Sequence, residues 1–331
     1  MQAIIYRDYG SADVLQLSDV TRPSPGDNQV MIKVYVTALN AADWRLMNGK
    51  PLPLRFVTGL FKPKQSILGT DIAGVIEAVG RNVRQFKVGD AVTGNIWGSG
   101  ASGLGQYICV PEHMLVLKPA NVSFEQAAAT PMAAVTALQG LRQGQIAAGQ
   151  QVLIYGASGG AGTFAVQLAK HFGATVTAVA SAAKHELMRS LGADQVLDYA
   201  KDDFAKSGQL YDLILGVNGY RSIFDYKRSL APKGRYVMVG GDMAQIFQAL
   251  ALGKLLSIGS TKRLSNVTAK TNQADLAEIG HLLSTGAIKA VIDRSYPLAE
   301  APAAMRYLQA GHAKGKILIN LHAEQALEQH V

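Results

Sequence analysis

The chain has 331 residues, enough for two domains of about 150 residues each. Hydrophobic residues make up 48% of it and charged residues only 17%, which excludes an intrinsically disordered chain. Lysine and arginine outnumber aspartate and glutamate by 32 to 24, a net charge of +8 that is compatible with nucleic acid, an anionic membrane or an anionic cofactor. Because the basic residues form no long run, we expect no nucleic-acid partner.

The cysteine content and the apolar stretches indicate the cellular compartment in which the protein is expected. Cys109 is the only cysteine, so no intramolecular disulfide can form and a reducing, cytoplasmic location is expected. The first residues, Met1 to Asp8, resemble a strand rather than a secretory signal. The most apolar stretch, Ala127 to Leu141, is shorter than the ~20 residues that cross a bilayer. No transmembrane segment is predicted.

The first third of the chain and the middle differ in pattern. Short β-branched runs such as 30–36 and 72–79, separated by proline- and glycine-containing turns, predict a β-rich domain. From Ser123 onward helices alternate with strands, which predicts a parallel, doubly wound sheet. The helices are expected at Ser123–Gly140, Gly160–Phe172 and Ala183–Leu191, and the strands at Gln151–Tyr155, Thr175–Ala180 and near Leu213 and Tyr236.

The last segment leaves this alternation after about Thr268. A helix, an extended stretch at 296–298, a second helix at Ala299–Gly311 and a strand at Lys316–Asn320 follow one another. We expect this segment to rejoin the first domain. The predicted α/β architecture is therefore a β-rich domain of residues 1–124 and 268–331 and a doubly wound domain of residues 125–267.

A glycine-rich turn joins the strand that ends at Tyr155 to the helix that follows. Ala157, Gly159 and Gly162 occupy the three small-residue positions of the dinucleotide fingerprint. These positions allow a tight turn, close approach of the backbone to a pyrophosphate, and close packing of helix on strand. Ser158, Gly160 and Ala161 complete the turn at the helix N-terminus, where unpaired amides favour an anion. The alternative is a glycine-rich turn that binds nothing.

The end of the second strand of this domain indicates which dinucleotide would bind. NAD-preferring sites place an acid there to hold the ribose 2′-hydroxyl, but residues 179–181 are Val-Ala-Ser. Ser181 offers a hydroxyl and Lys184 a cation to a 2′-phosphate, so NADPH is the expected cofactor. The alternative for Lys184 is a solvated helix residue.

Several separated segments carry a family resemblance. They are Leu68–Ile76, Val88–Val92, the turn at Ala157, Leu191–Asp194 with Tyr199, and Lys233–Val237. Together they resemble the medium-chain dehydrogenase/reductase superfamily, and within it the zinc-free, quinone oxidoreductase-like branch. The resemblance implies a GroES-like catalytic domain, a Rossmann NADP-binding domain, a substrate cleft between them and homodimers.

The resemblance also bears on the chemistry. At the motif positions where zinc-dependent members hold their catalytic metal, this chain has Asn40, Thr70 and Met132, which supply no thiolate, imidazole or carboxylate. No metal site is predicted. The chemistry that remains is hydride transfer from a nicotinamide to a quinone or to the β-carbon of an α,β-unsaturated carbonyl (enone), with negative charge developing on a carbonyl oxygen.

The resemblance further implies roles for individual residues. Asn40 matches an asparagine near the substrate whose amide would donate to the developing oxyanion; the alternative is a cap that shapes the turn. Asp43 would orient the loop at the substrate site and Trp44 would line the cleft. The remaining positions implied to approach the cofactor are Thr136, Tyr199, Val217, Asn218, Val239, Gly240, Gly241 and Lys316, the last also compatible with a solvated lysine.

The stretch 50–64 mixes apolar and basic residues and departs from shorter relatives. It is interpreted as a rim of the substrate cleft, as a contact with a membrane surface or a partner, or as an inert loop. No tyrosine lies between Tyr35 and Tyr107, which weakens an acyl-thioester reductase assignment. The leading function is NADPH-dependent reduction of a quinone or enone. The alternative is a nucleotide-binding, membrane-peripheral or partner-binding protein with little turnover.

Overall fold

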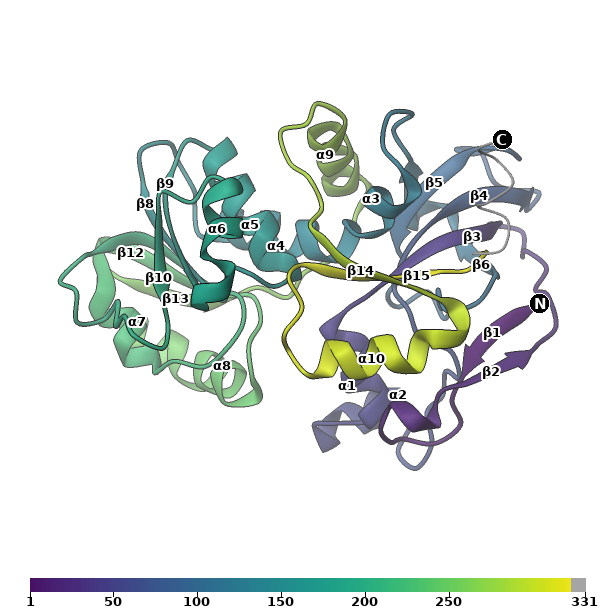
Figure 1. Cartoon of the computed structure of the whole chain (residues 1–331), viewed down its shortest axis with the longest axis horizontal. Coiled ribbons are helices and arrows are strands. Elements are labelled where there is room, and N and C mark those ends of the chain that lie inside the picture. The colour runs from purple at the N-terminus through teal and green to yellow at the C-terminus, as the bar shows by residue number, and fades with distance from the viewer. Residues whose placement is uncertain (323–331) are drawn as a thin grey trace. The chain divides into compact units, whose positions relative to one another are not determined.

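The computed structural model describes residues 1–322, and the chain divides into two compact units (Figure 1). Unit 1 comprises Met1–Met132, Thr271–Gly286 and the residues from Ala290 onward, whereas unit 2 comprises Ala133–Lys270 with Ala287–Lys289. The boundaries predicted from the sequence lie after residues 124 and 267. Within residues 1–322, every helix falls short of the length and apolar character that a bilayer crossing requires.

Unit 1 is built on a seven-stranded sheet whose strand order is β14-β15-β3-β4-β5-β7, with β6 paired to β3. A separate hairpin pairs β1 (Gln2–Ile5) with β2 (Gln16–Asp19). The strands of the larger sheet are β3 (Gln29–Leu39), β4 (Asp71–Val79), β5 (Ala91–Asn95), β6 (Tyr107–Pro111), β7 (Leu115–Leu117), β14 (Ile292–Pro297) and β15 (Lys316–Asn320). Strand β15 runs antiparallel to β3, with Ile317 opposite Leu39. The C-terminal segment thus completes the sheet of the N-terminal unit.

Five α-helices accompany this sheet within residues 1–322. They are α1 (Ala41–Asn48), α2 (Arg55–Thr58), α3 (Phe124–Ala128), α9 (Gln273–Ser284) and α10 (Ala301–Gln309). Helix α1 directly follows β3 and ends at Gly49, whose φ of +57° is the left-handed conformation that favours glycine at a helix end. Helix α10 buries Ala301, Ala304 and Met305 in the core of this unit.

Unit 2 contains a six-stranded, fully parallel sheet with the order β10-β9-β8-β11-β12-β13. The strands are β8 (Gln151–Tyr155), β9 (Thr175–Ala180), β10 (Gln195–Asp198), β11 (Tyr211–Gly216), β12 (Leu230–Met238) and β13 (Arg263–Asn266). Numbered within the unit, this order is 3-2-1-4-5-6, the doubly wound arrangement in which ligands bind where the order reverses. That reversal lies between β8 and β11.

The helices of unit 2 cover the sheet in two groups. Helices α5 (Gly160–His171) and α6 (His185–Ser190) contact β8, β9 and β10, whereas α7 (Ile223–Ser229) and α8 (Met243–Ser257) contact β12 and β13. Strands buried on both sides need apolar residues throughout, and the central residues 152–154 are completely buried. The predicted parallel, doubly wound sheet is confirmed.

One predicted helix is wrong in its extent. The stretch Ser123–Gly140 forms two helices, α3 and α4 (Pro131–Gln143). Ser123 caps α3 by accepting a hydrogen bond from the amide of Gln126. Pro131 cannot continue a helix from the preceding turn, because it lacks an amide hydrogen and restricts the residue before it. It therefore begins a second helix.

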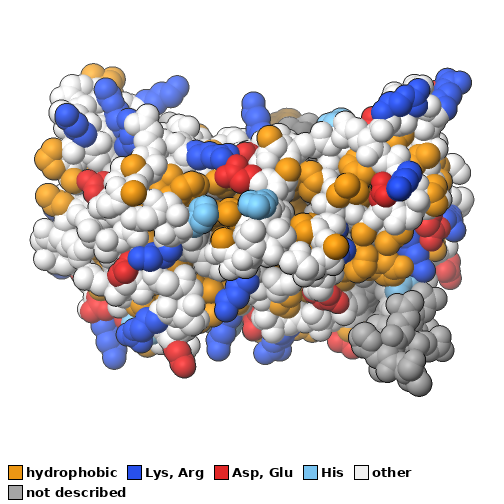
Figure 2. All heavy atoms as spheres, turned by 90° about the horizontal axis from the view of Figure 1, so that it is seen from above, with side chains coloured by type: hydrophobic (Ala, Val, Ile, Leu, Met, Phe, Trp, Pro, Cys, Tyr) orange, Lys and Arg blue, Asp and Glu red, His pale blue; other side chains and the backbone are white. Residues whose placement is uncertain are grey.

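The lysine and arginine side chains that make the net charge positive do not gather in one patch on the face drawn in Figure 2. Lysine and arginine side chains are spread over that face, with acidic and apolar side chains between them. Such a distribution raises the positive potential broadly rather than marking one basic groove there.

Candidate functional site

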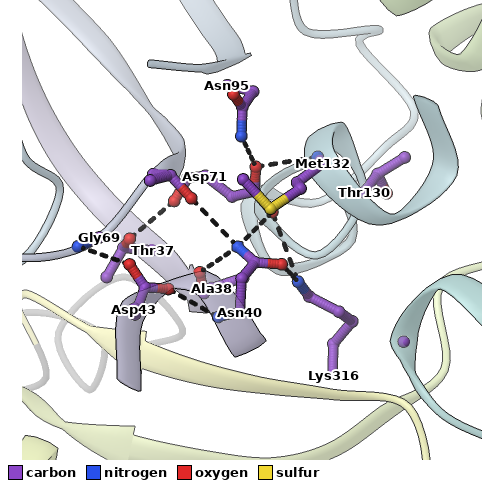
Figure 3. A network of polar contacts seen from close by, with 12 residues as sticks. Thr37, Ala38, Asn40, Asp43, Gly69, Asp71, Asn95, Thr130, Met132 and Lys316 are labelled. Atoms are coloured by element: carbon purple, nitrogen blue, oxygen red, sulfur yellow. Dashed lines mark hydrogen bonds and ion pairs between the residues drawn. The ribbon is translucent and has the colours of Figure 1, made fainter. Parts of the chain in front are cut away.

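A buried polar network surrounds Asn40, which lies between β3 and α1 (Figure 3). Its Oδ1 accepts a 2.6 Å hydrogen bond from Nζ of Lys316 on β15. Its Nδ2 donates to Oδ2 of Asp71 at 3.0 Å, to Oγ1 of Thr70 at 3.2 Å and to the carbonyl of Ala38 at 3.3 Å. Every polar atom of the Asn40 amide therefore has a partner inside unit 1.

Asp71, the first residue of β4, joins the network to other elements. Its Oδ1 accepts hydrogen bonds from Nδ2 of Asn95 at 2.8 Å and from the backbone amide of Met132 at 2.9 Å. Its Oδ2 faces Asn40 and, at 3.4 Å, the ammonium of Lys316. Asp71 is 0% exposed and Lys316 only 3%, so each charge depends on the other for compensation.

Asp43, in the first turn of α1, connects this helix to the turn before β4. Its Oδ2 accepts from the backbone amide of Asn40 at 2.7 Å and its Oδ1 from that of Gly69 at 3.1 Å. Burial raises the pKa of the Asp43 carboxyl to about 7, and the nearby Asp71 adds to this effect. The two backbone hydrogen bonds and Lys316 act in the opposite direction.

A cavity of about 290 Å³ opens beside this network within unit 1. Apolar side chains such as Leu46, Ile67, Leu68 and Ile96 line much of it. Asp43, Thr70 and the phenol-bearing Tyr6 bring polar groups to its wall. An apolar cavity with a few converging polar groups is the arrangement typical of a small-molecule site.

The predicted substrate residues lie differently with respect to this cavity. Asp43 is among the lining residues, whereas Asn40 lies behind the wall, in contact with Thr70. Trp44 is half-buried and packs against the hydrophobic core of unit 1, with the Arg45 guanidinium 5.5 Å from its ring centroid. Trp44 is not among the residues found to line the cavity.

Tyr6, Thr70 and Trp97 are among the cavity residues that were not predicted from the sequence. Tyr6 lies directly after β1, Trp97 follows β5, and Thr70 was considered only as a position that lacks a metal ligand. An isolated aromatic residue near a strand end carries no local pattern that separates a core residue from a cavity residue. Only the fold brings these residues together.

The stretch 50–64 contributes to the cavity wall through Thr58 and Lys64. It is held by Tyr9, whose hydroxyl donates to the carbonyl of Gly59 at 2.6 Å and whose ring lies 4.4 Å from the Arg55 guanidinium. Four large apolar side chains of this stretch face solvent. They are Leu52, Phe56, Leu60 and Phe61, which are 67%, 77%, 50% and 85% exposed.

The glycine-rich turn of unit 2 is tightly packed at Gly156 and Gly162 and open at Gly159. Gly156 has a φ of +80°, and a Cβ there would lie 2.6 Å from the carbonyl oxygen of Asn218. A Cβ on Gly162 would lie 2.5 Å from the carbonyl oxygen of Ala157, so helix α5 packs tightly on the turn. A Cβ on Gly159 would meet no atom closer than 4.0 Å.

The turn is therefore packed against protein at Gly156 and Gly162. It is open at Gly159, next to the amides at the N-terminus of α5 that have no partner within the helix. These residues fit the pyrophosphate of a dinucleotide. The tight turn falls on Gly156 rather than on Ala157, whose amide donates to the carbonyl of Val179 and whose side chain is buried. Ser158, Gly160 and Ala161 lie in the same turn and first helical residues.

Most of the other predicted cofactor residues follow the carboxyl ends of parallel strands, which meet at one edge of the sheet. Ser181 and Lys184 come after β9, and Tyr199 comes directly after β10. Val217 and Asn218 follow β11, and the residues that follow β12 are Val239, Gly240 and Gly241. Thr136 lies on α4, one turn before Gly140, where a Cβ would lie 2.5 Å from the Val239 side chain. Lys316, by contrast, belongs to the buried network of unit 1.

The end of β9 presents no carboxylate to a ribose. Residues 179–181 are Val-Ala-Ser, and Ser181 precedes a short 3-10 turn that contains Lys184. Both side chains are half-buried. A hydroxyl and a cation at this position favour a 2′-phosphate over a bare 2′-hydroxyl.

The residues described by the structure include no group of three His, Cys, Asp or Glu side chains placed to hold a metal ion. At the three positions where zinc-dependent relatives hold their metal, Asn40, Thr70 and Met132 offer an amide, a hydroxyl and a thioether. The ammonium of Lys316 contacts the first of them. This donor set does not suit zinc, which prefers thiolate, imidazole and carboxylate ligands.

Comparison with known proteins gives two matching sequence families. The "Alcohol dehydrogenase GroES-like domain" family matches residues 26–120, and the "Zinc-binding dehydrogenase" family matches residues 191–319. The first match lies in unit 1, and the second extends from unit 2 into the C-terminal strands of unit 1.

Individual proteins are similar over nearly the whole chain. The 2-methylene-furan-3-one reductase of Solanum lycopersicum is 34% identical, covering 97% of this chain and 79% of that protein. The chloroplastic NADPH-dependent alkenal/one oxidoreductase of Arabidopsis thaliana is 33% identical, covering 96% and 79%. Among solved structures, the quinone oxidoreductase from Coxiella burnetii has a TM-score of 0.87 at 29% identity and covers 97% of this chain and 99% of that chain.

Proposed function

Because this chain belongs to the medium-chain dehydrogenase/reductase superfamily, in its zinc-free, quinone oxidoreductase-like branch, we propose that it is an NADPH-dependent reductase of quinones or enones. The observation that carries the proposal is the buried network. An amide and a hydroxyl, backed by a lysine ammonium, stand beside an apolar cavity where zinc-dependent members hold a metal. Such a site can stabilise an oxyanion through hydrogen bonds.

The cofactor of this enzyme is NADPH, which supplies a hydride when it is bound. We assign its pyrophosphate to the turn 157–162 and its 2′-phosphate to Ser181 and Lys184. The strand-end residues Val217, Asn218, Val239, Gly240 and Gly241 are assigned to the rest of the dinucleotide, together with Thr136 and Tyr199.

The cavity of unit 1 is assigned to the acceptor. Its apolar wall removes water from a flat, conjugated substrate, which strengthens every hydrogen bond made inside it. Asp43 holds the backbone of this wall through Asn40 and Gly69 rather than presenting a free oxygen. Because the Asn40 amide already has three acceptors within 3.3 Å, we propose that Asn40 acts on the substrate through its neighbours.

The test is the oxidation of NADPH and of NADH with a panel of naphthoquinones, alkenals, simple aldehydes and alcohols, with and without a chelator. We expect chelator-insensitive turnover of NADPH with a quinone or an enone. Turnover confined to alcohols or aldehydes and abolished by the chelator would overturn the proposal. NADPH binding without turnover of any acceptor would favour the second candidate below.

The second candidate is a membrane-peripheral protein, and the stretch 50–64 favours it. Four exposed apolar side chains lie there beside exposed Lys50, Lys62 and Lys64, a composition that suits an anionic membrane surface. Flotation with phosphatidylglycerol and phosphatidylcholine vesicles tests it, using Phe56→Ser with Phe61→Ser. Phe224→Ser, which removes a phenylalanine of unit 2 that is 57% exposed, is the control. Absence of binding to anionic vesicles would remove this candidate.

Two further assignments complete the proposal. We propose a homodimer, as the family resemblance implies, with size-exclusion chromatography and light scattering as its test. We also propose a cytoplasmic, reducing location, supported by a sequence whose only cysteine is Cys109. Fractionation of cells that express a tagged chain tests the location.

A further inference from the structure

We propose that the hydroxyl of Thr70 is the catalytic hydrogen-bond donor to the carbonyl oxygen of the acceptor, with Asn40 and Lys316 behind it as positioning residues. This inference rests on the proposed reductase function, because it assigns the group that stabilises the charge formed by hydride transfer. It moves the donor from Asn40, where the sequence placed it, to the neighbouring residue that faces the cavity.

The three residues form a directed chain of hydrogen bonds. Nζ of Lys316 donates to Oδ1 of Asn40 at 2.6 Å, and Nδ2 of Asn40 donates to Oγ1 of Thr70 at 3.2 Å. Thr70 lines the cavity, whereas Asn40 stands one layer behind it. The chain therefore leads from a buried cation to the hydroxyl of a residue that lines the cavity.

The direction of this chain is fixed by the lysine. An asparagine amide can place its oxygen or its nitrogen on either side, but the oxygen must face an ammonium, which can only donate. The two hydrogens of Nδ2 then face three acceptor atoms, Oγ1 of Thr70, Oδ2 of Asp71 and the carbonyl oxygen of Ala38, and the last two can only accept. If the amide of Asn40 were rotated by 180°, its NH2 group would face the ammonium of Lys316, so that two donors would meet. Its oxygen would then face Oδ2 of Asp71, so that two acceptors would meet.

Thr70 is consequently left with a hydrogen to donate. A hydroxyl that accepts from Asn40 keeps its own O–H bond directed elsewhere. Within residues 1–322 no side-chain or backbone acceptor is observed for that hydrogen. Hydrogen bonds in a chain polarise one another, which makes the terminal O–H a better donor.

Six other side chains of the cavity wall carry donor groups, namely Tyr6, Thr58, Lys64, Gln65, Trp97 and Ser102. The Thr58 hydroxyl already donates to the carbonyl of Leu54 at 3.1 Å, and Gln65 and Trp97 are exposed. Lys64 is exposed and therefore needs reorganisation before it can serve a buried oxygen. Tyr6 is buried, and burial with the nearby Tyr9 and Asp43 raises the pKa of its phenol, so it stays protonated. None of the six has the oriented hydrogen-bond chain that stands behind Thr70.

The chemical step balances without a proton from Thr70. As a hydride adds to the β-carbon of an enone, the π electrons move to the carbonyl oxygen and an enolate forms. The Thr70 O–H stabilises this oxyanion and keeps its proton. A proton from solvent then adds to the α-carbon, so NADPH, one proton and the enone become NADP⁺ and the saturated ketone.

The experiment compares Thr70→Val, which keeps the shape and removes the hydroxyl, with Thr70→Ser, which retains a hydroxyl. Removing one oxyanion donor lowers kcat by roughly 10²- to 10³-fold, and we expect a loss of this size for Thr70→Val with NADPH binding unchanged. Thr70→Ser should retain most of the activity. Thr37→Val is the matched control, because the Thr37 hydroxyl donates to the carbonyl of Asp71 and does not reach the cavity.

The role of Asn40 is tested by non-additivity. Asn40→Ala should lower kcat in the wild-type background but cause little further loss in the Thr70→Val background. A merely structural role would lower kcat equally in both backgrounds. Circular dichroism and NADPH titration of each variant establish that it is folded.

The outcomes separate this inference from the proposed function. If the wild-type chain reduces no quinone or enone, the proposed function fails. If the wild type is active and Thr70→Val keeps its kcat, the assignment of Thr70 is overturned. A large loss in Tyr6→Phe or Lys64→Ala without one in Thr70→Val would also overturn it and would place the donor elsewhere on the wall.

Discussion

The ammonium of Lys316 lies 2.6 Å from the side-chain oxygen of Asn40, although 276 residues separate the two in sequence. The contact exists because β15 pairs with β3, and Asn40 directly follows the last residue of β3. From the sequence, Lys316 is expected to contact the cofactor or solvent. In the structure it is a buried cation next to Asp71, and its removal has consequences for both stability and chemistry.

Replacement of Lys316 by Met should destabilise the fold strongly. The Asp71 carboxylate, which is completely buried, would lose its compensating charge, and breaking such a pair typically costs about 3–5 kcal/mol. Urea unfolding at neutral pH measures this change in the free energy of unfolding. Lys314→Met, two residues earlier and exposed, should leave it nearly unchanged. Addition of Asp71→Asn to Lys316→Met should recover part of the loss, and a purely additive double variant would contradict the pairing.

Asp43 should make the stability depend on pH near neutrality. Its pKa is raised to about 7 in the folded chain from an ordinary value of 3.8 because it is buried. The folded state therefore binds more protons than the unfolded state between these values, and the free energy of unfolding falls as the pH rises through this window. The full contribution is present below about pH 4 and is lost above the raised pKa.

The measurement compares the wild type with Asp43→Asn by urea unfolding at several values between pH 4 and pH 8. The variant has no carboxyl to titrate, so the wild type should lose stability relative to it as the pH rises. Parallel pH profiles for the two proteins would show that the Asp43 carboxyl does not titrate in this range.

The local parts of the fold could be predicted from sequence because neighbouring residues determine them. The strand at Gln151–Tyr155, the turn and the helix from Gly160 follow from a buried run, small residues and an amphipathic pattern in direct succession. The break at Pro131 was also visible in the sequence, and a proline in a predicted helix should have divided it.

The polar network could not be predicted from sequence, because its members come from distant segments. Nothing local distinguishes Lys316 from a solvated lysine, since its burial depends on the pairing of β15 with β3. Tyr6 and Thr70 likewise reach one cavity only after the sheet and the segment before β4 have folded. A lone polar residue in an apolar strand is a signal of a buried partner, but it does not identify that partner.

Two glycines of the turn after β8 should respond differently to alanine. A Cβ on Gly162 would lie 2.5 Å from two carbonyl oxygens, so Gly162→Ala should cost about 1–3 kcal/mol, as overpacking does. Gly159 has a φ of −82° and open space around it, so Gly159→Ala should fold with little loss. It should nevertheless weaken NADPH binding, because the methyl group enters the space assigned to the pyrophosphate.

Thermal unfolding and NADPH titration of both variants test this pair. Equal losses of stability would show that the packing of α5 on the turn is looser than the structure indicates. Unchanged NADPH affinity in a well-folded Gly159→Ala variant would move the pyrophosphate away from this turn.

The choice between NADPH and NADH should depend on the end of β9. Ser181→Asp would place a carboxylate at the position that we assign to the 2′-phosphate, and Lys184→Ala would remove a cation from the same position. A hydrogen bond to a charged group contributes about 1.5–3 kcal/mol, so the double variant should lose roughly 10- to 100-fold in NADPH affinity or more. NADH affinity should change little or improve, since an acid at this position can accept from the ribose hydroxyls.

Arg189→Ala, on the exposed side of α6, should leave the ratio of the two dissociation constants unchanged. Fluorescence titration with both nucleotides measures the ratio, and an unaltered preference in the double variant would show that the 2′-phosphate lies elsewhere.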